Sequence, residues 1–153
     1  KRRKNMSKPN IEFQYRTSKV LWSAFLFAQS SFFLILYAAK PELFKFDFSQ
    51  PFLGENFVVV AIFGLMAIMN LFISLFLKFQ SVERAIDEQQ PKLLQTGLIV
   101  GCAFCESISI LGFVLGVAFN YPYFFAWFFV GTVGMLLHFP KRQNFENASF
   151  KQT

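Results

Sequence analysis

The longest apolar stretch of the chain, residues 93–119, contains one ionisable residue, Glu106, at its midpoint. About 20 apolar residues are enough to cross the hydrocarbon core of a bilayer as an α-helix. Residues 20–39, 57–77 and 123–139 form three further apolar stretches. A hydrophobic content of 54% and 24 phenylalanines exceed what a soluble core of 153 residues needs. The sequence therefore predicts an integral membrane protein.

The four stretches predict an all-α, polytopic fold with four transmembrane helices in two antiparallel hairpins. Only helices and closed barrels satisfy their backbone groups in lipid, and these stretches are too long and too uniformly apolar for barrel strands. We expect residues 80–92 to form a short charged loop between the second and third helices. Asn120-Tyr121-Pro122 predicts a tight turn before the fourth helix.

Basic residues are unevenly distributed over the connections. Thirteen of the 15 lysines and arginines precede the first stretch, follow the fourth or lie between the second and third; only Lys40 and Lys45 lie on the other side. This asymmetry predicts that both termini are cytoplasmic. The resulting division is a basic N-terminal segment (residues 1–19), a transmembrane domain (20–139) and a polar, mobile tail (140–153).

The basic N-terminal segment is interpreted as a topology signal rather than as a site for anionic lipid or nucleic acid. Met6 followed by Ser7 is typical of an initiator, which would make the five preceding residues an upstream remnant. A bacterial inner membrane is the expected location.

Glu106 shares its predicted depth with polar residues of three stretches: Gln29, Asn70, Ser107 and Ser109. A charge at the centre of a bilayer-spanning helix costs about 2.5–3.5 kcal/mol and usually faces a bundle interior or a partner. A carboxyl with amide and hydroxyl neighbours can hold a proton or help to coordinate a desolvated cation. It can equally act as a hydrogen-bonded staple that fixes helix register. Both interpretations remain open at this stage.

Small residues recur every three or four positions along residues 93–119, which places them on one helix face. They are Gly97, Gly101, Cys105, Ser109, Gly112 and Gly116. Such a stripe lets two helix backbones approach closely in lipid. We expect it to be a packing surface for a neighbouring subunit.

A family resemblance rests on Gln90-Pro91, on Leu94-Gln95-Thr96-Gly97-Leu98-Ile99-Val100-Gly101 and on Glu106-Ser107-Ile108-Ser109-Ile110-Leu111-Gly112-Phe113-Val114-Leu115. Residues 90–115 resemble the second helix of the proteolipid c subunit of rotary ATP synthases. The resemblance implies that Glu106 carries H⁺ or Na⁺ and that Ser107 is the hydroxyl that sodium-type members place beside the carboxylate. The chain differs from that family in having only Gly64 within residues 57–77 and in having apolar stretches on both sides of the matching hairpin.

Cys102 and Cys105 form a C-x-x-C pair of the kind found in four-helix thiol-quinone oxidoreductases. Those enzymes also carry a second cysteine pair, which this sequence lacks, so we interpret the two cysteines as small packing residues. His138, the one histidine, is expected to be an interfacial anchor beside Pro140 and Lys141. One histidine is too few for a haem or a histidine-rich metal site, and we expect no metal and no cofactor.

These features predict a small membrane protein without a catalytic site. We expect it to be a structural or accessory subunit of a larger membrane complex or homo-oligomer, with lipid and other subunits or copies as partners. The first alternative is a protein that handles H⁺ or Na⁺ at Glu106. The second is a thiol-quinone oxidoreductase that uses Cys102 and Cys105.

Overall fold

The computed structural model describes residues 8–45, 51–52 and 56–149, with the side chains from Ile11 onward. Within these ranges there are helices and no strand, so the all-α prediction is confirmed. The elements are α1 (Lys8–Ala39), η1 (Pro41–Lys45, a 3-10 helix), α2 (Phe57–Asp87), α3 (Lys92–Phe119), α4 (Phe125–Leu137) and α5 (Arg142–Ser149).

Among the residues that the structure describes, three helices are long and apolar enough to cross a membrane: residues 11–39 of α1, all of α2 and all of α3. The chain is therefore described as an integral membrane protein. The fourth predicted span is a shorter apolar helix, α4, of 13 residues. At 1.5 Å per residue it is about 20 Å long, less than the roughly 30 Å of a hydrocarbon core.

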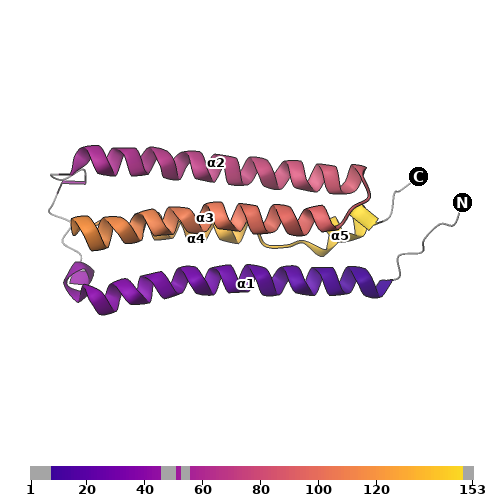
Figure 1. Ribbon diagram of the computed structural model, residues 1–153, viewed down its shortest axis with the longest axis horizontal. Coiled ribbons are helices and arrows are strands. Elements are labelled where there is room, and N and C mark those ends of the chain that lie inside the picture. The colour runs from indigo at the N-terminus through magenta and orange to yellow at the C-terminus, as the bar shows by residue number, and fades with distance from the viewer. Residues whose placement is uncertain (1–7, 46–50, 53–55, 150–153) are drawn as a thin grey trace, which may run out of the picture.

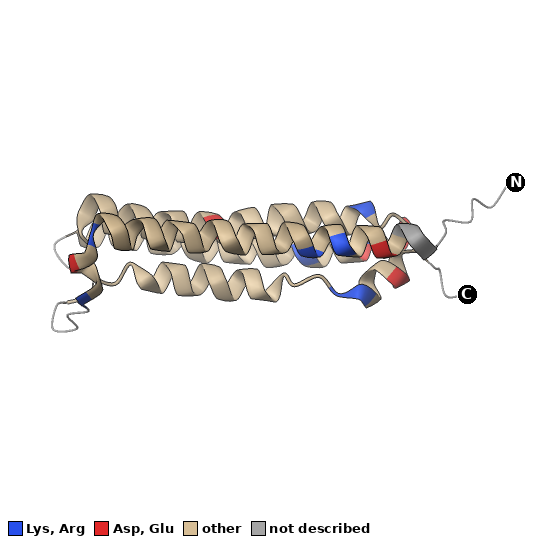
Figure 2. Ribbon diagram, turned by 90° about the horizontal axis from the view of Figure 1, so that it is seen from below, with Lys and Arg blue, Asp and Glu red and all other residues tan. Residues whose placement is uncertain are grey.

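The helices form two layers. Helices α1, α3 and α2 lie side by side with α3 in the centre, and α4 lies against one face of this row (Figure 1). The most extensive contacts join α3 to α2, to α4 and to α1. Lys, Arg, Asp and Glu gather at the two ends of the bundle, apart from one acidic position about midway along it (Figure 2). Because α1 and α2 flank α3 and α4 covers one of its faces, the opposite face of α3 is left open by the described chain.

Helix α2 extends ten residues beyond the predicted span, so the expected loop over residues 80–92 is wrong. The helix continues to Asp87 because glutamate and arginine, which follow the apolar stretch, are good helix formers. The turn occupies only residues 88–91, with Gln89 at φ 55° and the Gln90 amide donating to the Ala85 carbonyl at 3.0 Å. Such a left-handed turn closes the C-terminus of a helix.

The sequence predicts a mobile tail after α4, and over the described residues this prediction is wrong. Residues 142–149 form α5, and its Phe145 and Ala148 are buried in a cluster with residues of α1, α2 and α3. The three-residue spacing of these two side chains places both on one helix face. The exposed Arg142 pairs with Glu146 at 3.0 Å and with Glu12 at 4.0 Å.

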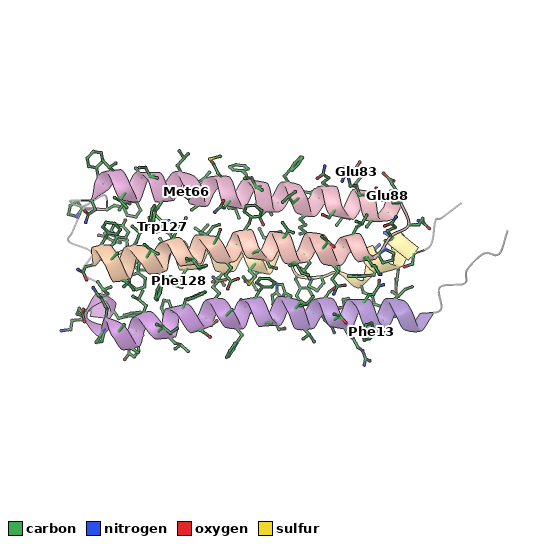
Figure 3. All side chains as sticks on the ribbon, viewed as in Figure 1. Phe13, Met66, Glu83, Glu88, Trp127 and Phe128 are labelled. Atoms are coloured by element: carbon green, nitrogen blue, oxygen red, sulfur yellow. The ribbon has the colours of Figure 1, made fainter. Side chains whose placement is uncertain are left out.

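The largest core cluster lies at the opposite end and is rich in aromatic rings. Phe124 is fully buried there, and its ring lies 5.2 Å from that of Phe44 and 6.2 Å from that of Phe128. Trp127 lies between α2 and α3, and Phe128 between α3 and α1, whereas Phe13 projects from the outer side of α1 (Figure 3). Successive residues of α4 therefore fill both grooves that flank α3.

Candidate functional site

Glu106 lies on the open side of α3. Four exposed residues lie on the same face of α3 as Glu106, at spacings of three, four or seven: Ile99, Ala103, Ile110 and Val117. We call these residues and Glu106 the outward stripe. The Glu106 side chain is half-buried within this outward stripe. In the part of the chain that the structure describes, its carboxylate accepts no hydrogen bond and forms no ion pair. The mid-depth acid is therefore presented to the surroundings of the bundle.

Asn70 and Ser107 meet between α2 and α3. The Asn70 amide nitrogen donates to the Ser107 hydroxyl at 2.8 Å, and that hydroxyl donates to the Phe104 carbonyl at 2.7 Å. Successive residues of a helix differ by about 100° in direction, so Ser107 turns toward α2 while Glu106 stays on the outward side. The pair joins two helices at the depth of Glu106.

Gln29 and Ser109 lie elsewhere, inside the bundle. The Gln29 amide nitrogen donates to the Phe128 carbonyl at 3.1 Å and to the Thr132 hydroxyl at 2.7 Å, which links α1 to α4. The Thr132 hydroxyl itself donates to the Phe128 carbonyl at 2.8 Å, so both partners accept and the orientation of the Gln29 amide is fixed. Ser109 is fully buried against Gly131. The structure thus does not bring these two residues together with Glu106.

The small-residue stripe faces the interior of the bundle. A β-carbon added at each of its glycines would clash with a side chain of the same chain. The closest contacts would be Gly97 with Ser81 at 2.3 Å, Gly101 with His138 at 2.5 Å, Gly112 with Trp127 at 2.6 Å and Gly116 with Leu36 at 2.9 Å. Cys105 lies in the same way against Gly134. The stripe is occupied by α1, α2 and α4, so it is not an outer surface for a neighbouring subunit.

A buried polar cluster that the sequence did not predict centres on His138, whose side chain is 2% exposed. Its Nδ1 lies 2.8 Å from the Gly134 carbonyl and donates to it, because a carbonyl can only accept. Its Nε2 lies 3.1 Å from the Ser74 hydroxyl, which also approaches the Gly101 carbonyl (3.0 Å) and the Cys105 sulfur (3.3 Å).

The predicted role of His138 as an interfacial anchor is therefore wrong. Helix α4 ends at Leu137, before the charged end of the bundle, and residues 138–140 pack against α2 and α3. The one sequence feature that could have indicated its burial is that His138 directly follows an apolar stretch. The polar cluster holds three helices together through groups that would be costly to leave unpaired in lipid.

Both thiols are enclosed by the bundle. Cys102 and Cys105 are free and fully buried, and Cys102 packs with Leu98 and Met135. Residues 8–45, 51–52 and 56–149 contain no group of three His, Cys, Asp or Glu side chains that could hold a metal ion. Cys102 therefore acts as a packing residue, whereas the Cys105 sulfur also belongs to the polar cluster, 3.3 Å from the Ser74 hydroxyl and 3.9 Å from His138 Nδ1.

Comparison of the chain with protein-family models gives no match, and comparisons with curated proteins and with solved structures find no significantly similar one.

Proposed function

We propose that the chain is a structural subunit of a larger membrane assembly, formed with other subunits or with further copies of itself, and that it joins this assembly through the outward stripe of α3. The observation that carries the proposal is the position of Glu106, midway along a membrane-length helix and without a partner in the described chain. A charged group at this depth costs about 2.5–3.5 kcal/mol. A hydrogen-bond donor on a neighbouring protein would offset that cost.

The hydrogen bonds of the other polar side chains at mid-depth support this proposal. The Asn70 amide bonds to Ser107 and the Gln29 amide nitrogen bonds to α4, so the chain provides partners for these donors at mid-depth. Within the described residues, Gln29 Oε1 and the Ser109 hydroxyl are buried without a hydrogen bond, but both lie inside the bundle and not on the outward stripe. The glycine stripe is already filled within the chain. The outward stripe is thus the part of α3 that remains available, with one acid among Ile99, Ala103, Ile110 and Val117.

The test is the mass of the detergent-solubilised particle extracted from the membrane in which the chain is native. We expect the wild-type particle to be larger than one chain and Glu106→Leu to reduce it to a single chain, since leucine removes the polar contact without creating a clash. Glu106→Gln keeps hydrogen-bonding capacity and is expected to retain the assembly. Glu83→Leu, at an exposed position near the charged end of α2 (Figure 3), is the matched control.

A wild-type particle of one chain, or an unchanged mass for Glu106→Leu, would contradict the proposal. The circular dichroism of each variant shows whether the helices are intact before the masses are compared.

A second candidate function is H⁺ or Na⁺ handling at Glu106, which the resemblance to proteolipid c subunits implies. The observation that favours it is that the Asn70 amide and the Ser107 hydroxyl, ligand types that a hard cation accepts, lie at the depth of Glu106 on the α2 side of α3. Glu106 would have to turn toward them to share an ion. Glu106→Gln separates the candidates. Normal assembly with loss of ion movement into vesicles supports ion handling, whereas unchanged function supports a structural contact.

A further inference from the structure

A small cavity lies where α4 gives way to α5. Because α4 ends at Leu137, the first part of α3, around Leu94 and Gly97, is covered by the non-helical residues 138–141 and by α5. A cavity of about 40 Å³ remains between this junction, α2 and α3. Lys78, Ser81, His138, Lys141 and Asn144 supply its polar lining.

The lining is positively charged and has no compensating acid. Lys78 and Lys141 contribute two ammonium groups, and no Asp or Glu is among the lining residues. Neither lysine forms an ion pair within the described ranges, where the paired acids Glu12 and Glu146 bond to arginines instead. Ser81 and Asn144 add neutral hydrogen-bond donors. The cavity therefore presents donors of the kind that recognise a small anion.

Lys78 is held in place by the bundle itself. Its ammonium group donates to the Leu137 carbonyl at 2.5 Å, at the C-terminus of α4. An ammonium group has three hydrogens, so two remain for another acceptor. Lys141, by contrast, is exposed and has no hydrogen bond from its side chain in the described structure. One fixed and one free cation thus flank the cavity.

The size and depth of the cavity restrict the ligand. Cavities for drug-sized or nucleotide ligands are about 300–1,000 Å³, so a volume of about 40 Å³ is suited to a single anionic group. The cavity lies at the end of the bundle where α1 begins and α2 ends, and Lys78 marks the exit of α2 from its apolar stretch. A cavity at the end of an apolar stretch is suited to a lipid phosphate, since basic pockets between helices bind anionic headgroups.

We infer that this cavity binds one phosphate group, carried by an anionic phospholipid or present as inorganic phosphate. The Lys78 and Lys141 ammonium groups supply the charge, and Ser81 and Asn144 supply additional hydrogen bonds.

The test uses the full chain in mild detergent and native mass spectrometry with phosphatidylglycerol or diacylglycerol, which differ in the phosphate-bearing headgroup. We expect wild type to retain phosphatidylglycerol in preference to diacylglycerol. Lys141→Gln should lower the affinity for phosphatidylglycerol about fivefold, the effect of one cation near a lipid surface. Lys92→Gln removes an exposed lysine at the same end but outside the cavity and should leave the affinity unchanged.

A second arm identifies the source of the phosphate. If inorganic phosphate raises the melting temperature of wild type but not of Lys141→Gln, while the two lipids bind equally, the site takes free phosphate. Preferential retention of phosphatidylglycerol identifies the lipid headgroup. Equal losses for Lys141→Gln and Lys92→Gln, or equal binding of both lipids without any effect of phosphate, would overturn the inference.

Discussion

Gly112→Ala is expected to lower the free energy of unfolding by about 1–3 kcal/mol, the usual cost of an overpacked core position. A β-carbon at Gly112 would lie 2.6 Å from the Trp127 β-carbon and 2.9 Å from the Phe124 carbonyl oxygen. Both atoms belong to or adjoin the backbone of the α4 segment, so no side-chain rotation relieves the clash. Helices α3 and α4 would have to separate.

Gly64→Ala is the matched control for this substitution. The nearest atom to its added β-carbon is Cζ2 of Trp127 at 4.0 Å, an ordinary contact distance. Alanine also favours helix by up to about 1 kcal/mol over glycine, so we expect unchanged or increased stability. Unfolding by a denaturing detergent can be followed through maleimide labelling of Cys102 and Cys105, which are fully buried in the folded bundle. Equal effects of the two substitutions would contradict the packing described for α3.

Phe124→Ala is expected to destabilise the bundle by about 3–5 kcal/mol, as typical for removal of a fully buried aromatic ring. Phe124 is completely enclosed, and its ring contacts those of Phe33, Phe44 and Phe128 from α1, η1 and α4. Its loss leaves a cavity shared by three elements, which the short α4 cannot close by shifting as a unit.

Phe129→Ala tests the same chemical change on the outer side of α4, where the ring is 70% exposed. Lipid can contact that position in either variant, so we expect less than 1 kcal/mol of change, the level of a surface substitution. The same thiol-labelling assay measures both variants. A large effect of Phe129→Ala together with a small one of Phe124→Ala would mean that α4 packs in the opposite orientation.

Much of the fold could be predicted from hydropathy alone. Long apolar stretches such as residues 57–77 and 93–119 have few alternatives to a helix in lipid, which is why the all-α class and the membrane-length helices were predicted. The ends of the helices could not be predicted in this way, because charged helix formers continue α2 beyond its apolar stretch to Asp87. The length of α4 also could not be deduced, since an apolar composition does not mark where His138 leaves the helix.

The sequence predicts the level of the candidate site residues along the helices but not the helix face on which each side chain lies. Counting residues places Gln29, Ser109 and Glu106 at a similar level, yet the first two are buried beside α4 and Glu106 lies on the outward stripe. A small-residue stripe likewise indicates close packing without indicating whether the partner belongs to the same chain. The contact between Gly101 and His138 depends on α4 returning against α3, a tertiary fact that no local pattern encodes.

Carbodiimide labelling of Glu106, measured by mass spectrometry on the separated single chain and on the assembled particle, tests the outward position of this residue most directly. Carbodiimides react with protonated carboxyl groups in apolar surroundings, and the labelling is carried out across pH with and without sodium. We expect Glu106 to be labelled in the single chain, sodium to have no effect on the labelling, and assembly to protect Glu106 from it. Protection by sodium in the single chain would favour ion handling, and equal labelling of the single chain and the assembly would contradict a contact at Glu106.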